Sequence, residues 1–127
     1  MTIAFWCVLA AGLMPYLATS IAKAGGERYN NRDPRAWLAK QQGFRARAHA
    51  AQLNSFEAFP FFAAAVIVAH LTQAPAERVG ALAVIFIVAR VAYLASYLAD
   101  WHWARSVLWL IGWLATLTIF VSGVGAT

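Results

Sequence analysis

Two ionisable side chains lie well inside apolar stretches of the sequence, and they are the residues there most able to do chemistry. Glu57 lies in the apolar run 53–71, and Arg90 lies in the run 79–98. A charge deep in a bilayer costs at least about 2.5–3.5 kcal/mol unless it is paired or faces water. The two residues therefore predict either a buried ion pair or a polar site that binds a ligand, and both interpretations stay open at this point.

Counting along the sequence places these two charges at one depth. Pairing residues symmetrically about a tight turn at residues 73–74 aligns three polar pairs, which are Glu57 with Arg90, Asn54 with Tyr93, and Arg47 with Asp100. At about 1.5 Å of rise per helical residue, Glu57 and Arg90 each lie about 15 Å from the basic edge. We therefore expect polar groups of the two segments to meet inside the apolar region.

Helical periodicity gathers the same polar residues into two stripes. One stripe belongs to the second expected helix and the other to the third, and their members are Arg47, Asn54 and Glu57, and Arg90, Tyr93 and Tyr97. A structural ion pair with Asn54 and Tyr93 bonded around it explains part of this pattern. It does not explain why the first stripe continues to Arg45 and a basic loop, so the whole stripe favours a binding function.

The elements that must position these residues are membrane helices. Of the 127 residues, 62% are hydrophobic and 12% are charged, which is too apolar for a soluble domain. The apolar residues fall into four runs near the ~20 residues that cross ~30 Å of hydrocarbon. We predict one all-α domain over residues 1–127, an integral membrane four-helix bundle with helices at about 3–22, 44–71, 77–99 and 103–124. The single cysteine, Cys7, excludes an intrachain disulfide.

The basic residues predict the orientation of the bundle. Most of them lie in the loop 23–43 or just after it, against Glu27 and Asp33, and they are Lys23, Arg28, Arg32, Arg35, Lys40, Arg45 and Arg47. The positive-inside rule makes this loop cytoplasmic and puts both termini outside the cytoplasm. Orientation accounts for most of the net charge of +5, so we expect no nucleic-acid partner. The loop would attract an anionic ligand or anionic lipid. Three isolated histidines without metal spacing predict no metal site.

Three segments of the sequence resemble one family. RARAHAAQLNSFEAFPFF supplies Arg47, Asn54, Glu57 and Pro60, RVAYLASY supplies Arg90, Tyr93 and Tyr97, and RSVLWLIGW begins at Arg105. In this pattern, and in its length and helix order, the chain resembles a bacterial-type member of the MAPEG superfamily, the membrane-associated proteins of eicosanoid and glutathione metabolism. The resemblance covers essentially the whole chain.

The resemblance implies a homotrimer in the membrane lipid of the bacterial inner membrane, with glutathione as cosubstrate between neighbouring subunits. Arg105 would be the catalytic residue beside the thiol, since a guanidinium favours the nucleophilic thiolate. The residues that would bind glutathione are Arg47, Asn54, Glu57, Arg90, Tyr93 and Tyr97. The second substrate would be a lipophilic electrophile or hydroperoxide that arrives from the bilayer, in a transferase or peroxidase reaction.

Two other functions remain open. Many eicosanoid-type members have a second arginine where this chain has Ala50, and a helical wheel puts Arg45 and His49 far from the stripe. This departure favours a non-catalytic member that binds lipid or serves assembly. A small multidrug transporter also has four helices and needs an embedded acid, which Glu57 could supply. Arg90 at equal depth would neutralise that acid, so we rank the transporter last.

Overall fold

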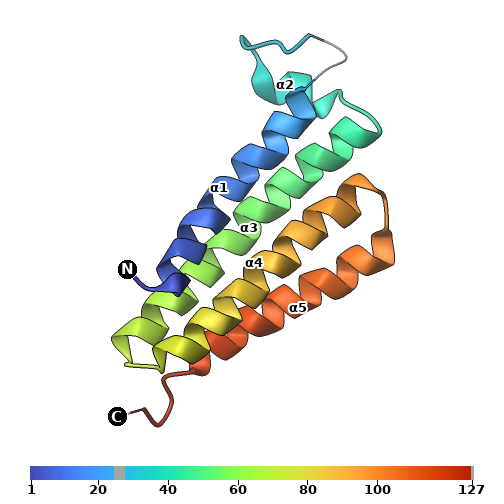
Figure 1. The fold of residues 1–127 in the computed structure, drawn as a ribbon. Helices are drawn as coiled ribbons and strands as arrows, with labels where there is room; N and C mark the ends of the chain where they lie inside the picture. Colours follow the sequence, from blue (N-terminus) through green and yellow to red (C-terminus); the bar gives the residue numbers. More distant parts are fainter. Residues whose placement is uncertain (25–27, 127) are drawn as a thin grey trace.

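The computed structural model describes residues 1–24 and 28–126, and these form helices without strands (Figure 1). The helices are α1 (Ile3–Lys23), α2 (Pro34–Ala39), α3 (Phe44–Leu71), α4 (Ala76–Leu98) and α5 (His102–Val121). Within the described residues four helices, all but α2, are long and apolar enough to cross a membrane. The predicted all-α membrane four-helix bundle is therefore confirmed. Glu27, which the charge count of the loop included, lies outside the described residues.

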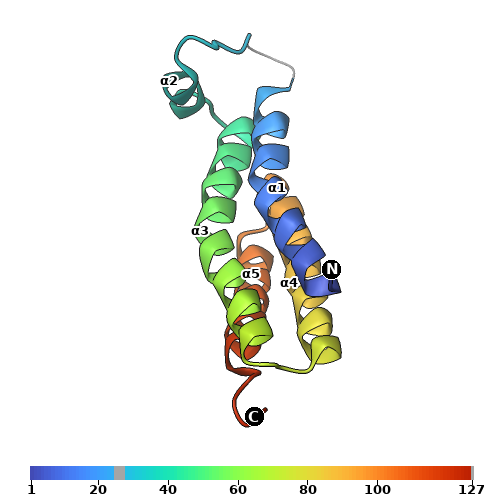
Figure 2. The same cartoon turned by 90° about the vertical axis from the view of Figure 1, so that its left-hand side faces the viewer.

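The four long helices run alternately up and down (Figures 1 and 2). Helix α1 packs mainly on α3 and α4 mainly on α5, and the two pairs meet through α1–α4, α3–α5 and α3–α4 contacts. Both termini lie at the end opposite α2. We call the end with α2 and the α4–α5 turn the loop end, and the end with the α3–α4 turn the terminal end.

Small residues let α1 and α3 approach closely. The buried alanines of α1 recur at about the helical repeat, and those of α3 face them, with 0–4% exposure: Ala4, Ala11, Ala18 and Ala22, and Ala48, Ala51, Ala65 and Ala69. Membrane helices associate through such small-residue contacts because lipid provides no hydrophobic drive between helices. Between α3 and α4 the rings of Phe62 and Phe86 stack with centroids 3.9 Å apart. Cys7 is also buried, in the hydrophobic cluster that contains Phe62 and Phe86.

The loop after α1 contains the short helix α2, which includes Trp37. Asp33 caps α2 by accepting from the Ala36 amide at 3.3 Å, and Pro34 occupies its first turn. Trp37 is buried against Ala22 and donates from Nε1 to the Arg28 carbonyl at 2.9 Å. These contacts fasten the basic loop to the loop end of the bundle.

Tight turns end α3 and α4. Gln73 and Asp100 both have φ of 59°, the left-handed conformation that follows the end of many helices. After Gln73, the Ala74 amide donates to the Ala69 carbonyl at 2.9 Å, which closes the six-residue bond of a Schellman motif. The same bond closes the turn at Asp100 from Trp101. Connections this short make α3, α4 and α5 successive antiparallel neighbours.

Candidate functional site

A continuous series of cations and aromatic rings joins the core to the loop end. The Arg90 guanidinium carbon lies 4.2 Å from the centroid of the Tyr93 ring. Tyr93 meets Tyr97 edge to face with centroids 5.6 Å apart, and the Arg105 guanidinium carbon lies 4.2 Å from the centroid of Tyr97. The spacing of the three α4 residues puts them on one face. The fold therefore brings together four of the seven predicted site residues. Three of them lie on α4, and the fourth, Arg105, lies on α5.

Arg90 is a buried cation whose contacts, among the residues that the structure describes, do not include a carboxylate. It is 3% exposed, and its Nη2 lies 3.5 Å from the Ser55 hydroxyl oxygen, at the limit of a hydrogen bond. A buried guanidinium is costly unless it is paired and hydrogen-bonded, and a ring face with one long bond compensates it weakly. An anionic group bound beside Arg90 would supply the missing charge.

The ion pair between Glu57 and Arg90, one of the two interpretations of the sequence, is not formed. The two side chains have no nitrogen–oxygen contact within 4.0 Å, and Glu57 is exposed. The Arg90 hydrogen bond goes instead to Ser55, two residues earlier on α3. Two residues turn a helix by about 200°, so a small error in the pairing register moved the expected partner to another face of α3. Counting residues along a helix gives the depth of a residue in the membrane, but it does not determine which neighbour its side chain faces.

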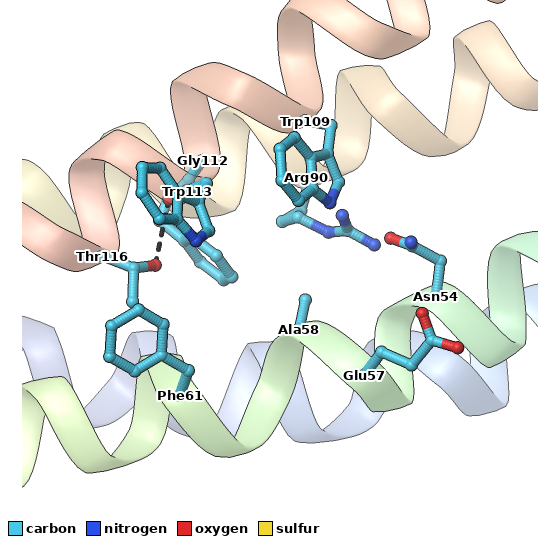
Figure 3. Close-up of a pocket in the computed structure, with 10 residues that line it drawn as sticks. Asn54, Glu57, Ala58, Phe61, Arg90, Trp109, Gly112, Trp113 and Thr116 are labelled. Carbon is cyan, nitrogen blue, oxygen red and sulfur yellow. Dashed lines mark hydrogen bonds between the residues drawn. The ribbon is translucent and has the colours of Figure 1, made fainter.

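A cleft of about 240 Å³ opens between α3 and α5 beside Arg90. Asn54 and Glu57 line its polar part with Arg90, and the rest is apolar, with Phe61, Phe86, Trp109 and Trp113. Figure 3 shows the Asn54 amide and the Arg90 guanidinium pointing toward one another across it. The cleft thus offers charged and amide groups at one side and aromatic rings at the other.

Asn54 contributes an unsatisfied acceptor to this cleft. Its Oδ1 atom is buried and has no hydrogen-bond partner among the described residues, so the expected bond to Tyr93 is not formed. Buried polar atoms are nearly always hydrogen-bonded in native proteins, and each exception needs an explanation. A bound molecule with an N–H or O–H donor would satisfy this oxygen.

Arg105 lines a second and smaller cleft of about 150 Å³, together with Tyr93, Ser106 and Trp109. Trp109 lines both clefts, so the two are neighbours. It stacks on Trp113 with centroids 6.3 Å apart and an angle of 12°. Sequence reasoning missed both tryptophans. Their four-residue spacing from Arg105 puts all three on one face of α5, a signal that could have identified them.

Arg47 lies at the loop end, away from both clefts. Its Nε and Nη2 donate to the Leu98 carbonyl at 3.3 and 3.2 Å, which ties the start of α3 to the end of α4. The sequence predicted that Arg47 would pair with Asp100, but its partner is the carbonyl of Leu98, two residues earlier on the chain. Arg45 donates from Nη2 to the Ala24 carbonyl at 3.0 Å. His49 contacts Gln52 at 3.2 Å.

Within residues 1–24 and 28–126, no group of three or more His, Cys, Asp or Glu side chains is arranged to hold a metal ion. No protein of the curated set and no solved structure matches the chain. A model of the MAPEG family matches residues 3–125, nearly the full length, and this confirms the resemblance found in the sequence motifs. Together with the four membrane-length helices, the match shows that the chain is a membrane protein that belongs to the MAPEG family.

Proposed function

We propose that this protein is a glutathione-dependent membrane transferase or peroxidase that acts on lipophilic electrophiles or hydroperoxides. The observation that carries the proposal is the series Arg90, Tyr93, Tyr97 and Arg105, which leads from a buried cation without a carboxylate partner to a second cation at the loop end. Glutathione is an anionic tripeptide whose carboxylates are the groups that guanidinium cations bind.

The groups of glutathione match those that lack partners in the chain. Its carboxylates suit Arg90, because a guanidinium offers paired donors to a carboxylate. An amide N–H of the tripeptide can donate to Asn54 Oδ1, the acceptor left unsatisfied. The exposed carboxylate of Glu57 suits the ammonium group. Tyr93 lines the smaller cleft with Arg105 and can add a hydroxyl group there. Arg47 would act as a further carboxylate clamp only by exchanging its bond to Leu98.

Arg105 would promote formation of the thiolate. A free thiol has a pKa near 8.5, and an adjacent guanidinium favours the anion, which is the nucleophile. In the transferase reaction, the thiolate sulfur forms a bond to an electrophilic carbon, and the leaving group departs with its electron pair. In the peroxidase reaction, sulfur attacks the terminal peroxide oxygen, and the O–O bond breaks to give an alcohol after protonation. A second glutathione then reduces the resulting sulfenic acid, giving water and the disulfide. The lipophile would lie against Trp109 and Trp113.

A neighbouring subunit would complete the site. The cleft beside Arg90 measures about 240 Å³, whereas ligand pockets are typically about 300–1,000 Å³. This shortfall supports a homotrimer in which glutathione lies between subunits. We place the protein in the bacterial inner membrane. The basic residues at the loop end support an orientation with that end in the cytoplasm and both termini outside.

The proposed role of Arg105 is tested by thiolate absorbance in the ultraviolet. Detergent-solubilised protein mixed with glutathione below pH 8 should show an absorbance from bound thiolate, and Arg105→Ala should abolish it. Arg78→Ala, an exposed arginine at the terminal end, serves as the matched control and should retain the absorbance. Equal thiolate signals in all three proteins would refute the role of Arg105.

A second candidate is a non-catalytic family member that binds lipid or serves assembly. The observation in its favour is Ala50, which cannot bind an anion where many relatives have an arginine. Arg45 and His49, the nearby cationic candidates, contact Ala24 and Gln52 instead. Glutathione binding without thiolate formation would support a binding protein, and absence of binding would support a member that has lost the cosubstrate.

A further inference from the structure

A larger cavity lies at the terminal end of the bundle, opposite the proposed glutathione site. Its volume is about 340 Å³, and it is enclosed by the start of α1, the end of α3 and the start of α4. In Figure 1 these segments meet near the N-terminus, far from the α4–α5 turn that leads to Arg105. The residues that define it are Thr2, Phe5, Val66, His70, Gln73 and Val79. It shares none of its lining with the clefts beside Arg90 and Arg105.

The floor of this terminal cavity is apolar and reaches the core. Ala4, Val66 and Val79 are 1–5% exposed and belong to the main hydrophobic cluster. One wall is aromatic, because Phe5 and His70 meet edge to face with ring centroids 5.1 Å apart. An apolar and ring-bearing part of a ligand would therefore fit the inner part of the cavity.

The rim of the terminal cavity is polar, and the described residues that line it include no Asp, Glu, Lys or Arg. The Thr2 oxygen accepts from the Phe5 amide at 3.5 Å, which leaves its hydroxyl hydrogen free to donate. Among the described residues, the His70 ring and the Gln73 amide make no hydrogen bond within the protein. The backbone of Gln73 adopts the left-handed conformation of its turn. The rim thus presents hydrogen-bond donors without a formal charge.

We propose that the terminal cavity binds a neutral, ring-bearing lipophile with a hydrogen-bond acceptor, such as an aryl ketone or a related carbonyl compound. Its volume falls in the range of ligand pockets, and an apolar floor with a few polar groups is the usual lining of such pockets. The absence of full charges disfavours glutathione and other ionic ligands there. A hydrocarbon chain has no acceptor, so it would leave the hydrogen-bond donors of Thr2 and His70 unsatisfied. Exposed Leu71 and Ile3 flank the cavity, so the ligand would enter from the bilayer.

Photolabelling with benzophenone tests this proposal without glutathione or activity. Benzophenone is a neutral aryl ketone, and on illumination its carbonyl carbon joins a nearby carbon after its oxygen takes the hydrogen of that C–H bond. Labelled peptides from detergent-solubilised protein are identified by mass spectrometry. We expect saturable labelling at the start of α1 and in residues 66–79, with competition by acetophenone and not by dodecane. Labelling spread over all lipid-facing helices, or equal competition by dodecane, would overturn the proposal.

Matched variants test the hydrogen-bond donors of the rim. His70→Leu and Thr2→Val should each raise the benzophenone concentration that gives half-maximal labelling by about three- to tenfold. This factor corresponds to the free energy of one neutral hydrogen bond. His102→Leu and Thr118→Val change the same residue types elsewhere and should label as the wild type does. Ala74→Leu, at the turn that lines the cavity, should block it. Because Ala74 also packs against the hydrophobic cluster, helical circular dichroism checks the fold of this variant. Unchanged labelling in both rim variants would refute the role of the donors.

Discussion

Replacing Tyr97 by leucine should weaken glutathione conjugation by about two- to thirtyfold. The Arg105 guanidinium carbon lies 4.2 Å from the centroid of the Tyr97 ring, within the range of a cation–π contact. Such a contact is worth about 0.5 kcal/mol when exposed and about 2 kcal/mol when desolvated. Arg105 is partly buried, so the loss should fall between these limits. If the ring holds Arg105 at the thiol, that free energy appears in kcat/KM.

The assay compares Tyr97→Leu with Tyr97→Phe. A soluble preparation in detergent is supplied with glutathione and a chlorodinitrobenzene electrophile, and the rate of conjugate formation gives kcat/KM. Phenylalanine keeps the ring and removes only the hydroxyl group, so Tyr97→Phe should lose less than threefold. Tyr16→Leu removes an exposed tyrosine that contacts Phe56, and it serves as the control.

Two results would refute this reasoning about Tyr97. Equal losses in the leucine and phenylalanine variants would assign the role to the hydroxyl group, as a donor to the thiolate. Wild-type rates in both variants would mean that the ring does not position Arg105. A loss in Tyr16→Leu as large as in Tyr97→Leu would indicate general destabilisation instead.

Three further predictions concern stability, each measured by thermal unfolding in detergent. Gly123→Ala should destabilise the fold by about 1–3 kcal/mol, because a Cβ there would overlap both the hydroxyl group and the Cβ of Thr72; Thr72→Ala should relieve only part of this loss, since alanine keeps the Cβ. Arg47→Met should cost about 1.5–3 kcal/mol through loss of its two-nitrogen bond to Leu98. Gln73→Gly should stabilise the fold by about 1 kcal/mol, since glycine adopts positive φ without steric cost.

Each stability prediction has its own control. Gly80→Ala meets Ile3 at an ordinary 3.6 Å and lies inside α4, so it should stabilise the fold by up to about 1 kcal/mol. A loss at Gly80 equal to that at Gly123 would contradict the overlap. Arg35→Met removes an exposed arginine of α2 and should change stability little, and a matching loss there would indicate a general charge effect. Gln52→Gly, inside α3, should destabilise by about 1 kcal/mol, opposite in sign to Gln73→Gly.

The four membrane helices could be predicted because each is specified locally. An uninterrupted apolar run near 20 residues leaves the backbone no alternative to a helix in a bilayer, and no tertiary contact is needed to decide it. The short helix α2 also has a local sequence signal, since Asp33 and Pro34 are favoured residues at the start of a helix. Family membership followed from motifs that occur on three helices.

The contacts within the site could not be predicted in the same way. Both interhelical contacts of the polar stripes are displaced by two residues from the expected pairing, Arg90 to Ser55 and Arg47 to Leu98. Such a displacement is only about 3 Å along the axis but about 200° around it, so the wrong side chain is chosen as partner. Tyr93 was expected to form a hydrogen bond through its hydroxyl group, yet both Tyr93 and Tyr97 meet the arginines through their ring faces. Cation–π contacts of this kind depend on side-chain rotamers, which the spacing of residues in the sequence does not determine.

Isothermal titration of the detergent-solubilised protein with glutathione tests the central claim most directly. The series of cations and rings from Arg90 to Arg105, with the unsatisfied Asn54 oxygen beside it, predicts saturable binding at millimolar glutathione or below. Asn54→Leu should weaken that binding, because it removes the acceptor for a peptide N–H of the ligand. The absence of any binding heat at millimolar glutathione, with the helical fold intact, would contradict the account.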